Sequence, residues 1–296
     1  MMKRIALLQE GTVSHEAVNN LLAGDPAELV HYQQITDVFR ATAQGNTDYS
    51  VIPIENTIDG SVSLHLDWLV HEVDIPMQVE WVYPSRQNLI GSSQEFTLPS
   101  GELDLSKIVK IMSHPVAIPQ CQKFIREHVP QAQLESVSST AQAVEIVKQN
   151  PGQGWAAIGT TLAAQTHQLD ILASGITDHH NNFTRFVLIG QQPLVLQRQP
   201  EGHRTSVLVM LPSDYPGALH QVLAAFAWRR LNLLRIESRP TKKQLGSYYF
   251  YIEVMESVES VLLTAAFAEI EALQCQVRVL GSYPCFPYLD NTITID

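Results

Sequence analysis

Short apolar segments alternate with helically spaced apolar residues through the first two-thirds of the chain, and this pattern limits the possible folds more than any other feature. Strands that alternate with helices are typical of βαβ units and a mostly parallel sheet. The pattern predicts strands at residues 5–8, 49–54, 75–81, 108–112, 155–158 and 186–189. It predicts helices at residues 36–43, 61–70, 119–128 and 140–148, and an earlier one with Ser14 as its N-cap. The expected fold class is therefore α/β.

A second pattern begins after residue 190. Through residues 191–203 the periodicity disappears while Gln, Pro and Gly accumulate, which indicates a linker between a first domain, 1–190, and a second domain, 204–296. The second domain is expected to contain, in order, a strand at 206–211, a helix at 218–230, strands at 232–238 and 248–254, a helix at 258–273 and a strand at 276–280. This βαββαβ order is the ferredoxin-like arrangement.

Composition excludes several classes of partner. The 296 residues carry 19 basic and 30 acidic side chains, a formal net charge of −11, and no long run of Lys and Arg, so no nucleic acid partner is expected. No apolar stretch reaches the roughly 18 residues that span a membrane. The three cysteines form no C-x-x-C pair, and the first apolar run stops at Gln9, which together favour a cytoplasmic location. Without a metal-ligand cluster or a nucleotide signature, we expect no cofactor and no metal.

Polar residues follow several predicted strands or precede the helices that come next. In open α/β sheets, ligands bind beyond the carboxyl ends of strands, where hydroxyls and free backbone N–H groups hold anions. The residues in these positions are Glu55, Asn56, Thr57, Ser113, His114, Ser138, Ser139, Thr140, Thr160 and Thr161. They predict a site for a small anion. The alternative is that they are ordinary N-caps, for which Ser, Thr and Asn are preferred in any helix.

The segment Asn181-Asn182-Phe183-Thr184-Arg185-Phe186 leads directly into a predicted strand. An arginine in this position could clamp a carboxylate with two parallel hydrogen bonds. A surface ion pair is the alternative. The residues by themselves leave both possibilities open.

Several stretches occur in an order and spacing that match one known family. They are Gly11-Thr12-Val13-Ser14, Val51-Ile52-Pro53-Ile54-Glu55-Asn56-Thr57, Ser113-His114-Pro115, Ser139-Thr140-Ala141, Asn182-Phe183-Thr184-Arg185-Phe186 and Ile236-Glu237-Ser238-Arg239-Pro240. On these stretches, the chain resembles the prephenate dehydratase family over essentially its full length. The resemblance implies a catalytic region of two α/β lobes with the fold of type II periplasmic binding proteins. It also implies a C-terminal ferredoxin-like ACT domain that binds an amino acid between subunits.

The resemblance implies roles for particular residues as well. It assigns catalysis to Thr184, Arg185, Glu55 and Asn56. It assigns substrate binding to Thr12, Thr57, Ser113, His114, Thr140, Asn182 and Phe186. It assigns effector binding to Asp214, Gly217, Ala218, Leu219, Glu237, Ser238 and Arg239. Asp214 stands where the family often has Asn, and the added negative charge could weaken binding of a carboxylate.

The implied reaction converts prephenate to phenylpyruvate, with loss of carbon dioxide and water, under control by phenylalanine. Aromatisation of the ring drives the reaction, so no cofactor is needed. Thr184 is the expected donor to the departing hydroxyl, and Arg185 is the expected anchor of the pyruvyl carboxylate. Two alternatives stay open: an arogenate dehydratase, and a non-catalytic amino-acid sensor with the same domains. We expect a homodimer or a homotetramer.

Overall fold

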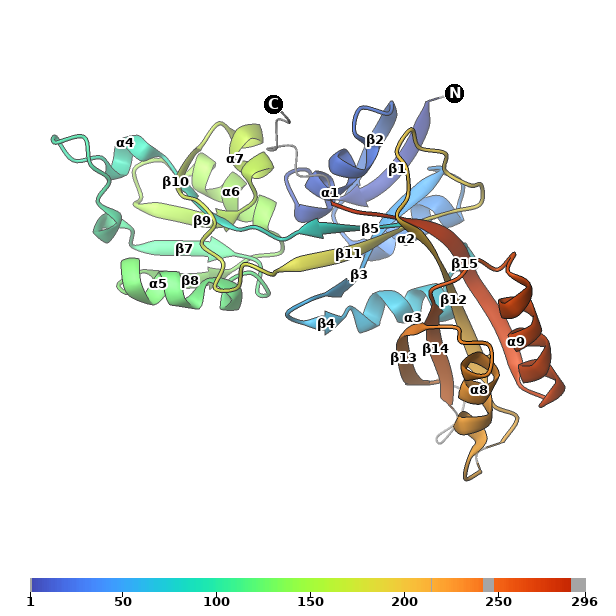
Figure 1. Ribbon diagram of the computed structural model, residues 1–296. Coiled ribbons are helices and arrows are strands. Elements are labelled where there is room, and N and C mark those ends of the chain that lie inside the picture. Colours follow the sequence, from blue (N-terminus) through green and yellow to red (C-terminus); the bar gives the residue numbers. More distant parts are fainter. Residues whose placement is uncertain (1, 214, 242–247, 289–296) are drawn as a thin grey trace, which may run out of the picture.

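The computed structural model describes residues 2–213, 215–241 and 248–288, which form two α/β lobes and a C-terminal domain (Figure 1). The first lobe contains strands β1 (Lys3–Leu8), β2 (Ala27–Tyr32), β3 (Tyr49–Asn56) and β4 (Gly60–Ser61), and helices α1 (Val13–Leu22), α2 (Ile35–Ala43) and α3 (Ser63–His71). Strand β1 pairs in parallel with β2 and β3, as the βαβ pattern predicts. The N-cap of α1 is Thr12, so the expectation of a cap at Ser14 is wrong; Ser14 is buried in the first turn.

The second lobe is a smaller sheet covered by helices. Its strands are β6 (Asn88–Gly91), β7 (Lys110–Ser113), β8 (Gln133–Ser136), β9 (Trp155–Gly159) and β10 (Asp170–Ala173). Its helices are α4 (Ser93–Phe96), η1 (Leu105–Lys107), η2 (Pro119–Cys121), α5 (Gln122–His128), α6 (Thr140–Gln149) and α7 (Thr161–His167). The strand order is β10-β6-β9-β7-β8. Strand β7 pairs in parallel with β8 and β9, whereas β6 is antiparallel to both of its neighbours.

Two long strands connect the lobes. Strand β5 (Met77–Pro84) leads from the first lobe toward the second, and β11 (Phe183–Gly190) returns (Figure 1). Strand β11 lies between β3 and β5 and pairs antiparallel with both. The large sheet is therefore mixed, where the sequence pattern predicts a mostly parallel one, because the returning chain runs against the strands beside it.

The C-terminal domain has the expected βαββαβ order. Its elements are β12 (Gly202–Met210), α8 (Ala218–Ala227), β13 (Leu233–Pro240), β14 (Tyr248–Val254), α9 (Val261–Ala272) and β15 (Gln276–Phe286). Its sheet, in the order β13-β14-β12-β15, continues into the first lobe because the end of β15 pairs in parallel with β5. A Cβ at Gly281 would overlap the backbone of Met77, so glycine is needed where β15 passes β5.

The two faces of the C-terminal sheet differ in what covers them. Helices α8 and α9 cover one face and pack through Phe226 and Phe267. On the other face, Tyr251 and Tyr283 share one hydrophobic cluster with Leu66 of α3. The domain therefore shares a buried core with the first lobe. Among the described residues, no helix is long and apolar enough to cross a membrane.

Candidate active site

A cavity of about 440 Å³ lies between the two lobes. Its volume falls in the range of pockets that hold small organic ligands. Polar residues from both lobes and from the connecting strands line it, among them Gln9, Thr12, Ser14, Asn56, Asp59, Ser85, Gln87, His114, Gln120, Ser139, Thr140 and Thr184. No lysine or arginine is among the described residues that line the cavity.

The register of β11 against β3 brings Thr184 and Asn56 together in the cavity wall. Thr184 lies opposite Asn56, and the next residue, Arg185, lies opposite Glu55. Successive side chains of a strand point to opposite faces. Thr184 and Asn56 accordingly line the cavity, whereas Arg185 and Glu55 form an ion pair on the other face. The Asn56 Nδ2 group donates to Thr184 Oγ1 at 3.0 Å.

The hydrogen bonds of Asn56 fix the orientation of its amide. Its Oδ1 accepts from the backbone N–H groups of Ile58 and Asp59, at 2.8 and 3.1 Å. Its Nδ2 is therefore the end that faces β11, and it also donates to Asn182 Oδ1 at 2.8 Å. Asn182 in turn donates to Gln120 Oε1 at 2.9 Å. This chain of amides joins β3, β11 and the second lobe, and it holds the cavity wall in one arrangement.

Two helix N-termini, one from each lobe, line the cavity. Thr12 is the N-cap of α1, and Ser139 is the N-cap of α6, where its Oγ accepts from the Gln142 N–H at 3.0 Å. Ser139 also donates across the cleft to Gln9 Oε1. The free N–H groups and the dipole of a helix N-terminus favour a negative charge nearby. The two helix ends can therefore hold the anion that the sequence pattern predicts.

The lobes also meet closely beside the cavity, at Gly11. This residue has φ +78°, and a Cβ there would lie 3.0 Å from the Cα of Ala163 in α7. Thr160 donates to the Gly11 carbonyl oxygen at 2.6 Å. Glycine is required at this contact both by its backbone conformation and by the space available.

The structure separates the expected substrate-binding residues into two groups. Thr12, His114, Thr140 and Phe186 line the cavity together with Asn56 and Thr184. Ser113, Thr57 and Asn182 are not among its lining residues. Ser113 is fully buried and donates to the Ile158 carbonyl at 2.8 Å, and Thr57 donates to the Asn181 carbonyl at 2.6 Å. Because these hydroxyls bond to the backbone and Asn182 bonds to its neighbours, all three support the wall instead of facing a ligand.

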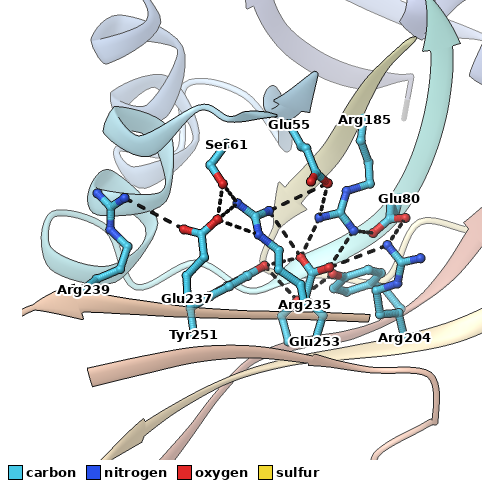
Figure 2. Close-up of polar contacts among 12 residues, drawn as sticks. Glu55, Ser61, Glu80, Arg185, Arg204, Arg235, Glu237, Arg239, Tyr251 and Glu253 are labelled. Carbon is cyan, nitrogen blue, oxygen red and sulfur yellow. Dashed lines mark hydrogen bonds and ion pairs between the residues drawn. The ribbon is translucent and has the colours of Figure 1, made fainter. Parts of the chain in front are cut away.

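Arg185 is not among the residues that line the cavity, in contrast to what its expected role as a carboxylate clamp requires. Its guanidinium forms two parallel hydrogen bonds with Glu253 of β14, at 2.6 and 2.8 Å, and pairs with Glu55 at 2.9 Å and Glu80 at 3.4 Å (Figure 2). Only 12% of the Arg185 side chain is exposed. The same geometry directs the Glu55 carboxylate to Arg185 and away from the cavity, so the cavity lining does not support its expected catalytic role, which stays a prediction.

We call this group the charge cluster. It consists of Glu55, Glu80, Arg185, Arg204, Arg235 and Glu253 (Figure 2). Burial opposes charge on Arg185, but Glu253 and Glu80 raise its pKa. Burial likewise opposes charge on Glu253, yet Arg185 and Tyr251 hold its pKa below the ordinary range. Burial raises the pKa of Glu80 despite its two arginine partners.

Two of the expected effector-binding residues lie next to the charge cluster, at the contact with the first lobe. Glu237 of β13 accepts a hydrogen bond from Ser61 (Figure 2), and Arg239 pairs with Asp67 of α3 at 2.6 Å. Ser238 points to the other face, because it lies opposite Phe250, which packs under α8 and α9. The side chains of Glu237 and Arg239 are thus engaged within the chain, and their direct contact with an effector stays a prediction.

The remaining effector-binding candidates lie at the start of α8. Gly217 is the N-cap of this helix with φ +91°, a conformation that glycine adopts readily. Ala218 is buried in the first turn, and Leu219 packs against the core of the domain. Asp214 lies outside the described residues.

Sequence reasoning missed several polar residues of the cavity, among them Ser85 and Gln87. Ser85 Oγ lies 2.6 Å from Thr184 Oγ1. Gln87 is buried, and its Oε1 has no hydrogen-bond partner among the described residues. Both follow β5, so they belong to the class of polar residues after a strand, but the predicted strand ended at Trp81, before this segment.

Two histidines, His114 at the cavity and His15 in α1, have lowered pKa values. Burial lowers the pKa of His114, which lines the cavity, so its imidazole is neutral at pH 7. Burial and the neighbouring His31 lower the pKa of His15 to about 4. No group of three His, Cys, Asp or Glu side chains that could hold a metal occurs within the described part of the chain.

Comparison with known proteins agrees with this geometry. The family model described as prephenate dehydratase matches residues 5–194, and the model described as ACT domain matches residues 205–272. The prephenate dehydratase of Bacillus subtilis (strain 168) is 38% identical over 283 residues, which are 93% of this chain and 96% of the relative.

Two solved structures are similar over nearly the whole chain. One is a prephenate dehydratase in complex with L-Phe from Arthrobacter aurescens, with 30% identity, a TM-score of 0.81 and coverage of 95% of this chain and 89% of that one. Another, GqqA, is described as a novel type of quorum quenching acylase; it has 25% identity, a TM-score of 0.81 and coverage of 96% and 98%.

The fold, the cavity and these matches define a two-lobed α/β enzyme with an appended ferredoxin-like domain. The chain belongs to the prephenate dehydratase family, and its C-terminal domain is an ACT domain. The expected fold class, α/β lobes followed by an ACT domain, is confirmed.

Proposed function

We propose that this enzyme converts prephenate to phenylpyruvate in the cavity between its lobes, with Thr184 as the donor to the departing hydroxyl. The observation that carries the proposal is the environment of the Thr184 side chain. It lines the cavity, accepts a hydrogen bond from a fixed Asn56 amide and lies 2.6 Å from a second hydroxyl. Such a preorganised group needs little rearrangement when charge develops on the substrate.

Substrate binding in this proposal relies on neutral groups. Prephenate carries two carboxylates, and the cavity offers the N-termini of α1 and α6 together with the Thr12 and Thr140 hydroxyls. A carboxylate held by a buried arginine would be stabilised before the reaction, which raises the barrier to its loss. The lack of Lys and Arg among the described lining residues therefore suits a decarboxylation.

The chemical step balances without a cofactor. The C–C bond to the ring carboxylate breaks and releases carbon dioxide, and its electron pair moves into the ring while the C–O bond breaks. The departing oxygen takes up a proton and leaves as water. A threonine hydroxyl is a weak acid, so Thr184 acts mainly through a hydrogen bond to the developing hydroxide, and solvent supplies the net proton.

One assay distinguishes the proposed function from two alternatives, an arogenate dehydratase and an amino-acid sensor. The purified protein is incubated separately with prephenate and with arogenate, and the products are identified. We expect phenylpyruvate from prephenate. Phenylalanine formed only from arogenate would assign an arogenate dehydratase, and no product from either substrate would favour an amino-acid sensor.

An acylase activity like that in the description of GqqA is less favoured by the site. A hydrolytic serine or threonine needs a base beside it. In this cavity, Thr184 and Ser85 bond to each other, and the ring of His114 accepts from the Val116 N–H at 3.3 Å.

We propose that phenylalanine controls the enzyme from the ACT domain. The N-terminus of α8, with Gly217 as its cap, offers free N–H groups to the carboxylate of an amino acid. Ser238 lies on the same side of the sheet as α8 and supplies a further polar group. The L-Phe complex of the Arthrobacter aurescens relative supports the choice of effector.

The charge cluster offers a route from the ACT domain to the reaction site. Glu253 lies on β14, and its partner Arg185 is the residue next to Thr184. An effector that shifts β13 and β14 changes the geometry of this pair and therefore the position of Thr184. A coupling of about 1–3 kcal/mol corresponds to a change in activity of roughly 5- to 150-fold.

The effector site is tested with the variant Gly217→Ala. An alanine at φ +91° is strained, so the helix N-terminus must move. We expect phenylalanine affinity, measured by calorimetry, to fall at least about fivefold, while turnover without phenylalanine is retained. Unchanged affinity would place the effector elsewhere.

Two further expectations remain predictions. One is the homodimer or homotetramer, which sedimentation would check, and the other is the cytoplasmic location.

A further inference from the structure

We propose that Ser85 is a positioning residue that donates a hydrogen bond to Thr184 and thereby directs the Thr184 proton toward the substrate. The inference rests on the proposed function and concerns a residue that the sequence resemblance does not include. Ser85 follows β5, is 5% exposed and lines the same cavity as Thr184. Its backbone N–H donates to the Asn182 carbonyl at 2.8 Å, so its position is fixed by the strand pairing.

Either oxygen could be the donor in the bond between Ser85 and Thr184, and counting donors and acceptors shows what each direction implies. A threonine hydroxyl has one proton and two lone pairs. Asn56 donates to Thr184, so one lone pair is occupied. If Thr184 donated to Ser85, its single proton would be consumed. If Ser85 donates instead, both lone pairs of Thr184 are occupied and its proton is left for a ligand in the cavity.

Two fixed donors on one oxygen also restrict the rotation of that hydroxyl. The Asn56 amide cannot reverse, because its Oδ1 accepts two backbone N–H groups. With Ser85 as the second donor, the Thr184 O–H bond has one remaining direction. Ser85 therefore reduces the rotational entropy that the Thr184 hydroxyl must lose when it donates to the departing hydroxyl of the substrate.

The test compares turnover in five proteins: the wild type, Ser85→Ala, Ser85→Cys, Thr184→Ala and the double variant Ser85→Ala with Thr184→Ala. Ser85→Ala should lower kcat on the order of tenfold with KM changed less than about threefold, as for one lost hydrogen bond that acts in the transition state. Cysteine fills the same space but is a weak donor, so Ser85→Cys should be nearly as slow as Ser85→Ala.

The double variant separates positioning from direct action. If Ser85 acts only through Thr184, removing it from a chain that already lacks the Thr184 hydroxyl costs less than about twofold further. An additive loss, a wild-type kcat in Ser85→Cys, or a raised KM as the main effect would each overturn the inference. Unfolding temperatures show whether each variant is folded. A wild type that makes no phenylpyruvate would instead overturn the proposed function, and this inference with it.

Discussion

The two faces of β11 have opposite electrostatic character. On one face, Thr184 lies among neutral hydroxyls, amides and helix N-termini in a cavity open to a ligand. On the other face, Arg185 lies in the buried charge cluster beside the ACT domain. A shift of a single residue along the strand thus separates the reaction site from an interdomain contact. Adjacent residues in a motif need not act on the same ligand, because a strand sends them to opposite faces.

The largest effect in this comparison concerns stability. Arg185→Ala leaves Glu253 and Glu80 buried with less compensation, so we expect the free energy of unfolding to fall by about 3–5 kcal/mol. The control is Arg278→Ala, which removes an ion pair between β15 and the exposed Asp74 together with one hydrogen bond to the Val70 carbonyl oxygen. That variant should lose little stability, because exposed pairs contribute little. Denaturant unfolding measures the free energy of unfolding of both variants. Equal losses would show that the buried charge cluster contributes no more to stability than the ion pair of Arg278.

The next largest effect is expected on turnover, after substitution of Thr184 on the cavity face of β11. Thr184→Ala should lower kcat on the order of a hundredfold or more with substrate binding largely retained, because the hydroxyl acts in the transition state. Thr184→Ser keeps the hydroxyl and should stay within about tenfold of the wild type. Steady-state kinetics with prephenate measures both variants. Near wild-type turnover in Thr184→Ala would remove this residue from the donor role.

A smaller effect is expected on control. The double variant Arg185→Met with Glu253→Leu replaces the buried pair by apolar side chains, which is often neutral for stability. It should reduce the inhibition by phenylalanine at least about fivefold, while phenylalanine still binds. Inhibition curves and calorimetry on the same samples provide the measurement. Full inhibition in this variant would mean that the signal takes another route.

The smallest effect is an expected lack of pH dependence on the cavity face. Burial lowers the pKa of His114 from its ordinary value of 6.5, so the imidazole stays neutral as pH rises from 7. We expect kcat/KM to be constant between about pH 7 and pH 9, where no carboxylate of the substrate titrates either. An apparent pKa inside this window would indicate an ionising catalytic group that the cavity description lacks.

The sequence predicted the fold better than it predicted the role of each side chain. The βαβ pattern and the βαββαβ order follow from apolar periodicity, which burial enforces. Strands β2 and β8 were not predicted because they lie at sheet edges, where polar and charged residues interrupt the pattern. Antiparallel β11 was predicted four residues short, three at its start and one at its end, and at the start Thr184 and Arg185 stand where an apolar run was expected.

The roles of Arg185 and Ser85 depended on contacts that no local pattern contains. Strand alternation alone indicates that Thr184 and Arg185 face opposite sides. The partner of Arg185 is Glu253, which is 68 residues away in the chain and belongs to another domain. Ser85 lies 99 residues before Thr184 and meets it only through the pairing of β5 with β11. Tertiary contacts of this kind decide function and become visible only in the folded chain.

The most direct test of the two-face account is the KM for prephenate of the Arg185→Met, Glu253→Leu double variant. This variant removes the arginine together with Glu253, and the other buried partner, Glu80, keeps its ion pair with Arg204, so changes in folding should not obscure binding. If Arg185 never touches the substrate, KM should stay within about threefold of the wild type. A rise of roughly tenfold or more, the size of a lost charge-assisted contact, would show that Arg185 binds a substrate carboxylate and would contradict the account.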